Sequence, residues 1–239
     1  MTHYFCTGGC NGLSENPISC QMPSCSKHQL SLSECNCTNG KHQNLFQNLN
    51  DSILLVIAGL PGTGKTIISK RIAQKLNYAH IDQNEIRRQQ GIKKMPQTQD
   101  ATLRKIDRIV AETLNKGKGI IVDSVHRYMF RRQQLYGVAS GAGARVLVIE
   151  CVCSSEEAKK RINQRPNSDG LISDPNNTKV YDKLAQLWED IKEHDFKYPG
   201  SDHVSYITYN TENNSFEEKI VQKEMMPFVN IVKQGLSSS

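Results

Sequence analysis

One short segment, Gly59-Leu60-Pro61-Gly62-Thr63-Gly64-Lys65-Thr66, limits the chain to a small number of folds. It matches the pattern G-x-x-x-x-G-K-[ST] at every fixed position. The apolar strand pattern Ile53–Ala58 precedes it, and apolar residues at helical spacing follow it. In such a loop, glycines let the backbone N–H groups turn inward toward phosphates, and the helix N-terminus adds a favourable dipole. The segment therefore predicts the binding of a nucleoside triphosphate.

The positions of this loop have distinct chemical roles. Lys65 is predicted to reach the β- and γ-phosphates, and Thr66 to place its hydroxyl on Mg²⁺. The expected cofactors at this end of the chain are ATP and Mg²⁺, with no preference of ATP over GTP decided by the residues. The remaining predicted nucleotide contacts come from the backbone and small side chains of Gly59, Pro61, Gly62, Thr63 and Gly64.

From Ser52 onward, apolar strand patterns alternate with amphipathic helix patterns. This alternation predicts an α/β fold of the P-loop NTPase type, a mostly parallel sheet with helices on both faces. The expected strands are Ile53–Ala58, Tyr78–Ile81, Ile120–Asp123, Val146–Val152 and Val204–Tyr209. The expected helices are Thr66–Leu76, Thr102–Asn115, Tyr128–Ser140, Glu156–Arg165, Thr178–His194 and Phe216–Val232.

The first part of the chain has a different composition. Six of the 8 cysteines fall within residues 1–37, among Gly, Ser, Asn and Pro with few large apolar residues. Such a segment cannot fold on an apolar core of its own. We therefore expect two domains, a small irregular Cys/His-rich module at 1–45 and a kinase-like P-loop domain at 52–235.

The module contains a set of residues suited to zinc. Zinc prefers thiolate and imidazole ligands, and a closed zinc site with four protein ligands is structural. Eight ligands would complete two such sites, while one site with spare thiols, or thiols that bind no metal, are the alternatives. His28 taken alone is equally well explained as a surface histidine. The predicted ligands are Cys6, Cys10, Cys20, Cys25, His28, Cys35, Cys37 and His42.

An acidic residue is needed near the magnesium shell. The strand pattern Gly119–Asp123 ends in the best-placed candidate, Asp123, which we expect to hold Mg²⁺ together with Thr66. The alternative is that an aspartate at a strand end only caps the following turn.

The segment Asp82-Gln83-Asn84-Glu85-Ile86-Arg87 resembles the substrate-side turn of a group of small P-loop kinases. This group includes polynucleotide kinases, adenylylsulfate kinases and zeta-toxin-like proteins. The resemblance implies an aspartate that accepts the proton of the acceptor hydroxyl and an arginine that steadies the acceptor. Arg87 matches the arginine, but the usual position of the base holds Asn84. Asp82, two residues earlier, matches a further acidic position and becomes the candidate base.

Other arginines extend this resemblance, which covers about residues 52–211. Asp123–Arg127, with Arg131 and Arg132 after it, is similar to the segment that follows the third strand and meets the acceptor. Arg161 and Arg165 look like lid arginines that close over the triphosphate, although this spacing also suits a solvated helix face. The segment 171–174, followed by Tyr181, resembles the region after the lid.

The net charge of +6 is concentrated in the kinase-like part. Residues 87–132 contain twelve Lys and Arg against four Asp and Glu, which would attract phosphates or nucleic acid. An ordinary solvated surface is the alternative. No apolar run approaches the roughly 20 residues of a membrane helix, and the N-terminus lacks a signal-peptide pattern. We therefore expect a cytoplasmic protein with no membrane partner.

Two functions remain open from the sequence. The first is a kinase that moves the γ-phosphate of ATP to a hydroxyl acceptor, which would be a polynucleotide, a nucleotide or a small metabolite. The second is a nucleotide-controlled regulator whose zinc module binds nucleic acid or a protein, and Asn84 favours it. A GTPase switch is disfavoured because no Asn-Lys-x-Asp segment occurs. The acceptor and the oligomeric state are not indicated by any motif.

Overall fold

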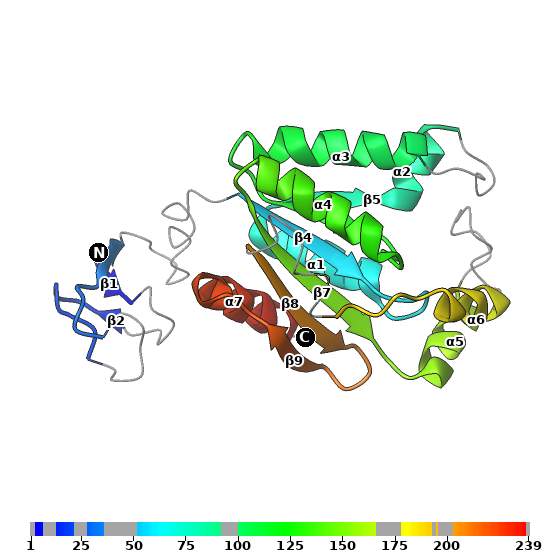
Figure 1. The fold of residues 1–239 in the computed structure, drawn as a ribbon. Coiled ribbons are helices and arrows are strands. Elements are labelled where there is room, and N and C mark those ends of the chain that lie inside the picture. The colour runs from blue at the N-terminus through cyan, green and yellow to red at the C-terminus, as the bar shows by residue number, and fades with distance from the viewer. Residues whose placement is uncertain are drawn as a thin grey trace. The chain divides into compact units, whose positions relative to one another are not determined.

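The computed structural model describes residues 3–6, 13–21, 28–35, 52–91, 100–165, 178–192, 195 and 203–237 (Figure 1). The chain divides into two units. The first consists of Met1–Asn50 and Lys223–Ile231, and the second of Asp51–Gln222 and Val232–Ser239.

A six-stranded sheet forms the centre of the second unit, in the order β5-β6-β4-β7-β8-β9. All neighbouring pairs are parallel except β8 and β9, which are antiparallel. Every residue of β4 is buried, as expected for a central parallel strand covered on both faces. The strands are β4 Ile53–Ala58, β5 Ala79–Asp82, β6 Ile120–Asp123, β7 Arg145–Val152, β8 Val204–Asn210 and β9 Ser215–Ile220.

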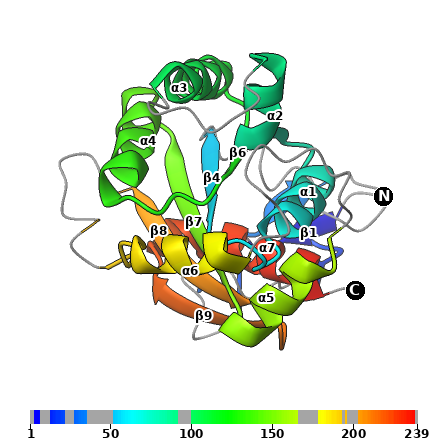
Figure 2. The same cartoon turned by 90° about the vertical axis from the view of Figure 1, so that its right-hand side faces the viewer.

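Helices cover both faces of this sheet, with α3 and α4 on one face and α1 on the other (Figure 2). This arrangement confirms the predicted P-loop NTPase type of α/β fold. No helix in the described part of the chain is long and apolar enough to cross a membrane. The helices are α1 Lys65–Leu76, α2 Gln83–Gln89, α3 Asp100–Leu114, α4 Met129–Gly141, α5 Ser155–Asn163, α6 Thr178–Gln186 and α7 Met226–Ser237, the last after a 3₁₀ turn at Lys223–Met225.

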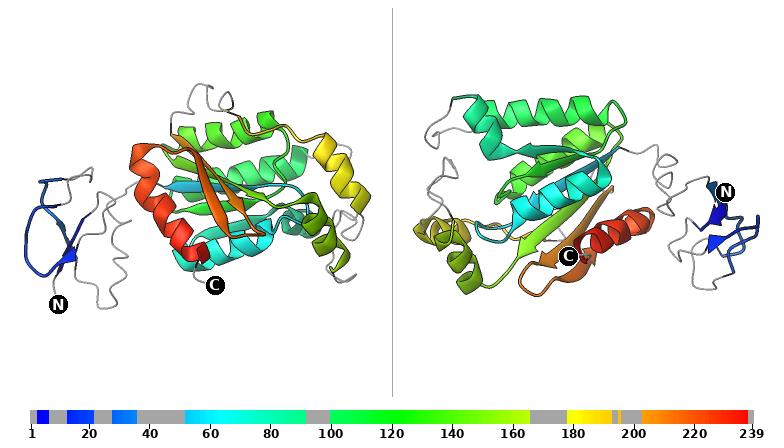
Figure 3. Two further views of the ribbon diagram at one scale, coloured as in Figure 1. Left: turned by 90° about the horizontal axis from the view of Figure 1, so that it is seen from below. Right: turned by 180° about the vertical axis from the view of Figure 1, so that it is seen from behind.

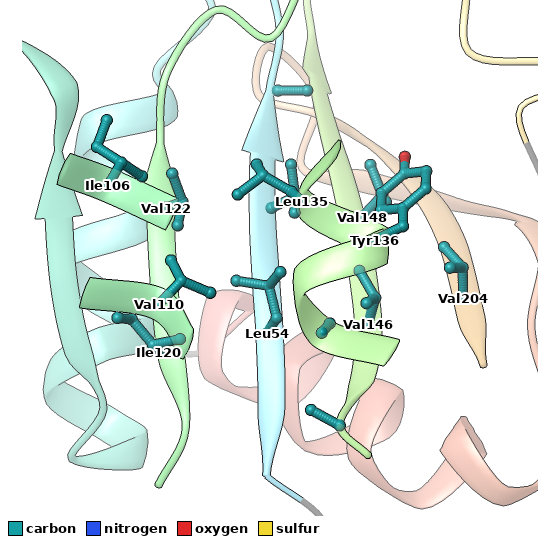
Figure 4. Close-up of a cluster of buried hydrophobic side chains, with 14 of the residues drawn as sticks. Leu54, Ile106, Val110, Ile120, Val122, Leu135, Tyr136, Val146, Val148 and Val204 are labelled. Atoms are coloured by element: carbon teal, nitrogen blue, oxygen red, sulfur yellow. The ribbon is translucent and has the colours of Figure 1, made fainter. Parts of the chain in front are cut away.

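The main core lies between the sheet and the pair α3 and α4 (Figure 4). Ile106 of α3 and Leu135 of α4 are buried against strand residues such as Leu54 and Val122. Side chains alternate between the faces of a strand, so the neighbouring residue Leu55 points to the opposite face, toward α1. The sheet is thus held rigidly from both sides, which fixes the positions of the strand ends.

One predicted helix, Phe216–Val232, is wrong. Its first part is strand β9, which forms a hairpin with β8 (Figure 3), and α7 begins only at Met226. Glutamates and lysine made the segment resemble a helix. However, Asn214 takes a left-handed φ of 57° in the turn, and the rings of Tyr209 and Phe216 stack at 4.4 Å. The turn and this cross-strand pair favour the hairpin.

Two further differences concern helix ends. The predicted helix Thr178–His194 stops at Gln186, because the chain then turns so that the Glu189 N–H donates to the carbonyl of Arg127. Helix α2 was not predicted. It begins because the Asp82 carboxylate accepts from the N–H of Asn84 at 2.8 Å, which is an N-cap.

The described part of the first unit contains a three-stranded antiparallel sheet in the order β2-β1-β3. The strands are β1 His3–Phe5, β2 Leu13–Ser14 and β3 Ser33–Cys35. A bridge between Cys20 and His28 lies outside these strands. This small sheet adds regular structure to a module that was expected to be irregular.

Candidate nucleotide and acceptor site

The glycine-rich loop connects the end of β4 to the start of α1. Gly59, Gly62 and Gly64 have φ values of 139°, 83° and 84°, a region that favours glycine. A Cβ on Gly59 would lie 2.4 Å from the carbonyl oxygen of Cys151, and one on Gly62 would lie 2.4 Å from that of Ala158. Bare backbone is therefore required here, and this fits a cradle for phosphate groups.

Side chains brace the loop from inside and outside. The Lys65 ammonium donates to the carbonyl of Leu60 at 2.7 Å, so the side chain crosses the loop. The Thr63 hydroxyl donates to the same carbonyl at 2.8 Å. From outside, the Thr211 hydroxyl donates to the carbonyl of Thr63 at 3.0 Å. The ammonium therefore lies where a phosphate held by the loop would meet it.

Lys65, Asp123 and Thr66 form one electrostatic group. Burial lowers the pKa of Lys65, and the nearby Asp123 carboxylate acts in the opposite direction. Burial raises the pKa of Asp123, and this is opposed first by Lys65 and then by a hydrogen bond from the Thr66 hydroxyl. The ammonium, carboxylate and hydroxyl of these residues thus form a cluster of polar groups next to the loop.

The oxygen atoms of Thr66 and Asp123 fit magnesium, which prefers hard oxygen ligands. Within the described ranges there is no group of three or more His, Cys, Asp or Glu side chains that could hold a metal ion. Magnesium usually keeps several waters and takes further ligands from substrate phosphates, so two protein oxygens suffice. The residues therefore fit a magnesium ion held jointly with a nucleotide.

The predicted acceptor residues lie beside this group. Strands β5 and β6 pair so that their last residues, Asp82 and Asp123, stand opposite each other. Arg87 is buried, and its guanidinium donates to the amide oxygen of Asn84 at 3.2 Å. Burial lowers the pKa of Arg87, Asp82 raises it, and Arg127 lowers it further. Asp82, Arg87 and Arg127 are thus near neighbours at the carboxyl edge of the sheet.

Arg161 of α5 and Arg165, just after that helix, lie in different surroundings. Arg161 donates to Glu157 at 2.8 Å and to the hydroxyl and carbonyl of Thr211 at 2.8 and 3.2 Å. Arg165 is close enough to Lys65 to lower the pKa of its ammonium. Arg165 therefore lies near the phosphate-binding loop, whereas Arg161 holds the segment after β8 against that loop.

Arg131 and Arg132 stabilise the segment after β6 from within. Arg131 pairs with Asp107 of α3 at 2.7 Å. Arg132 is fully buried, pairs with the fully buried Asp195 at 2.6 Å, and donates to the carbonyl of His126 at 2.9 Å. These contacts fix the loop that carries Arg127 beside Arg87.

His126 in this loop should make the stability of the protein depend on pH. Burial lowers the pKa of His126 to about 3, so the folded state requires the neutral ring. An unfolded histidine titrates near 6.5, so stability is lost as the pH falls below that value toward 3. Between pH 7 and pH 5 the expected loss is about 2 kcal/mol.

The variant His126→Asn should remove this dependence. Asparagine tolerates the left-handed φ of 51° at this position but does not titrate. Urea unfolding at pH 7 and pH 5 gives the change in free energy for each protein. The free energy of unfolding should fall less between pH 7 and pH 5 in the variant than in the wild type, by about the loss expected above. Parallel pH dependences would contradict the assignment.

The predicted zinc ligands are only partly described. Cys6 and Cys20 are buried, and the backbones of Cys20 and His28 are paired. Cys35 pairs through its backbone with His3. The other predicted ligands, Cys10, Cys25, Cys37 and His42, lie outside the described residues, as does the segment 171–174. Zinc therefore stays a prediction.

The site combines a strand, a loop with left-handed glycines and a helix, and around the loop it has a lysine, a threonine and an acidic residue at a strand end. This combination defines a P-loop nucleoside-triphosphate-binding protein. The chain belongs to the family described as "AAA domain", which matches residues 54–187 and thus more than half of its 239 residues. No curated protein matches the sequence.

Solved structures with a similar fold share little sequence with this chain. A Chloroflexus aurantiacus protein named a "putative kinase" is 17% identical, with a TM-score of 0.51 over 75% of this chain and 97% of its own. A sugar kinase from Janibacter is 15% identical, with a TM-score of 0.50 over 78% of this chain and 96% of its own. At such identities the similarity establishes the fold alone.

Some residues of the site were not recognised from the sequence. Ser69 and His80 both lie close to Asp123. Thr211, which is far from the loop in the sequence, donates a hydrogen bond to it at Thr63. None of them belongs to a motif, since each reaches the site only through the packing of separate elements. Ser69 had one detectable signal, a hydroxyl on the apolar face of an amphipathic helix.

Proposed function

We propose that the protein is an ATP-dependent kinase that transfers the γ-phosphate to a hydroxyl group. The observation that carries this proposal is that Asp82 stands opposite Asp123 at the end of the neighbouring strand, and that Asp123 in turn lies near Lys65. It brings a carboxylate suited to proton transfer next to a group suited to a phosphate and its metal. The names of the two similar structures, both kinases, agree with it.

In this proposal each residue has a defined task. The loop Gly59–Thr66 binds the triphosphate, and Thr66 with Asp123 holds Mg²⁺, which when bound neutralises phosphate charge. Asp82 accepts the proton of the acceptor hydroxyl while the oxygen of that hydroxyl attacks the γ-phosphorus. The bond to the β,γ-bridging oxygen breaks, and ADP leaves. Arg87 orients the acceptor.

Arg161 of α5 and Arg165, which lies just after that helix, have the remaining roles. Arg165, near Lys65, is placed to stabilise negative charge that develops on the transferred phosphoryl group. Arg161 maintains the shape of the loop through Thr211. We retain Arg161 as a second candidate for contact with the triphosphate.

The competing proposal is a nucleotide-controlled regulator with a zinc module that binds nucleic acid or a protein. The observation that favours it is Asn84, an amide at the position where the resemblance expects the catalytic aspartate. In the structure this amide accepts from Arg87. The boundary of the two proposed domains near residues 45–52 is common to both proposals.

Nucleotide binding is tested by Lys65→Ala. ATP at 100 times its dissociation constant should stabilise the wild-type protein by about 2.7 kcal/mol, and the variant should lose this effect. Thermal melting with and without MgATP measures it. The matched control is Lys70→Ala, an exposed lysine of the same helix, which should keep the full shift. An unchanged shift in Lys65→Ala would remove the proposed role of the loop.

Transfer is tested by supplying labelled ATP with 5′-hydroxyl oligonucleotides, nucleosides and small hydroxyl metabolites. A kinase converts one of these acceptors to a phosphorylated product in an amount that exceeds the enzyme. If ATP binds but no acceptor in any class is phosphorylated, the regulator becomes the better description.

A further inference from the structure

A chain of hydrogen bonds reaches Asp123 from residues of α1 and β5. The ring nitrogen Nε2 of His80 lies 3.0 Å from the Ser69 hydroxyl, which lies 3.2 Å from Oδ2 of Asp123. His80 Nε2 itself is 4.0 Å from the same carboxylate oxygen. Neither Ser69 nor His80 has a task in the function proposed above.

Three separate elements build this chain. Ser69 lies on α1, one turn after Thr66, and is fully buried. His80 lies on β5 two residues before Asp82, so both side chains are on the same face of the strand. Asp123 ends β6, which pairs with β5. The sheet and the helix thus hold all the groups in fixed positions.

The number of available hydrogens limits which group donates and which accepts in this chain of hydrogen bonds. The Ser69 hydroxyl has one hydrogen, and His80 Nε2 either donates to it or accepts from it. If Nε2 accepted, its lone pair would face the carboxylate at 4.0 Å and the Ser69 hydrogen would point away from it. If Nε2 carries the hydrogen, His80 donates to Ser69, and the Ser69 hydrogen can go to Oδ2 of Asp123 at 3.2 Å or to the carbonyl oxygen of Thr66 at 3.1 Å. Electrostatics favours donation to Asp123, because a charged carboxylate is a stronger acceptor than a backbone carbonyl.

We propose that Ser69 and His80 are positioning residues that orient the Asp123 carboxylate for Mg²⁺. Ser69 holds Oδ2, which leaves the other oxygen for the metal beside Thr66, and His80 fixes the direction of the Ser69 hydroxyl. Groups that hydrogen-bond to a metal ligand commonly change metal affinity or activity 10- to 100-fold when removed. The inference rests on the proposed function, since it assigns Asp123 to the metal of a bound nucleotide.

The experiment measures the Mg²⁺ concentration that gives half of the maximal ATP-induced thermal shift at fixed ATP. Ser69→Ala and His80→Ala should each raise this concentration about 10-fold, while excess Mg²⁺ restores the wild-type shift. His80→Gln keeps an N–H donor of similar reach and should return the requirement close to that of the wild type. A merely structural role would not predict this rescue.

The matched control is Ser205→Ala. Ser205 is equally buried on β8, and its hydroxyl accepts from the N–H of Gln222 at 3.1 Å. Its removal should leave the Mg²⁺ requirement unchanged even if it lowers the melting temperature. If Ser69→Ala does not fold, the pair His80→Ala and His80→Gln decides the outcome.

Two results would overturn the inference in distinguishable ways. If the wild type shows a Mg²⁺-dependent ATP shift and His80→Ala has the same requirement, the positioning role fails while nucleotide binding stands. If the wild type shows no ATP shift at any Mg²⁺ concentration, the proposed function fails and the inference falls with it.

Discussion

Replacing Asp82 by asparagine is expected to lower turnover about 10²- to 10⁴-fold and to leave ATP binding nearly intact. The amide cannot take a proton from the acceptor hydroxyl. Asparagine is as good an N-cap as aspartate, so the hydrogen bond to the N–H of Asn84 and the start of α2 are kept. Steady-state kinetics with the acceptor found in the transfer screen gives the turnover, and thermal shift gives ATP binding.

The neighbouring residues supply the controls. Glu85→Gln removes an exposed carboxylate that pairs with Arg88 at 2.6 Å, and it should keep turnover near that of the wild type. Asn84→Asp should be neutral or raise activity. Full turnover in Asp82→Asn would show that another group is the base. Activity that arises only in Asn84→Asp, with none in the wild type, would support the regulator.

Removing the carboxylate of Asp195 should destabilise the protein by about 3–5 kcal/mol. Asp195→Ala leaves the Arg132 guanidinium charged and fully buried without its carboxylate partner, although it keeps hydrogen bonds such as the one to the carbonyl of His126. Uncompensated charge is costly at this depth because water cannot reach it. Urea unfolding at neutral pH measures the loss.

An exposed pair with the same chemistry provides the comparison. Arg88 and Glu85 are also 2.6 Å apart, but their side chains are 37% and 48% exposed. Glu85→Ala should therefore cost less than about 1 kcal/mol. The double variant Arg132→Met with Asp195→Leu should recover most of the loss, since apolar side chains of similar volume replace buried ion pairs well. A loss below about 1 kcal/mol in Asp195→Ala would contradict the assignment.

The parts of the fold that could be predicted from the sequence are those governed by short-range patterns. Strands Ile53–Ala58 and Ile120–Asp123 have the predicted bounds because continuous apolar runs bounded by turn residues are characteristic of buried parallel strands. The glycine-rich loop was recognisable because its backbone geometry restricts residue types position by position. The two central strands and the loop that follows the first of them could therefore be placed from the sequence.

The parts that could not be predicted depend on contacts between distant residues. Ser215–Ile220 is a strand because it pairs with β8, although its own residues favour a helix. The place of Arg161 beside Thr211 depends on a segment 50 residues away. The approach of His80 to Asp123 likewise depends on how α1 and β5 pack. Spacing along one helix or strand carries no information about such partners.

The contact between Thr211 and Thr63 has a consequence for how the site comes into being. The two residues are 148 positions apart, and the same loop also rests on the carbonyl of Cys151. As the ribosome releases the chain from its N-terminal end, the loop emerges long before the residues that brace it. The nascent protein thus carries a recognisable phosphate-binding sequence well before it has a finished binding site. That site is completed only when the last parallel strand has been synthesised and joined to the sheet.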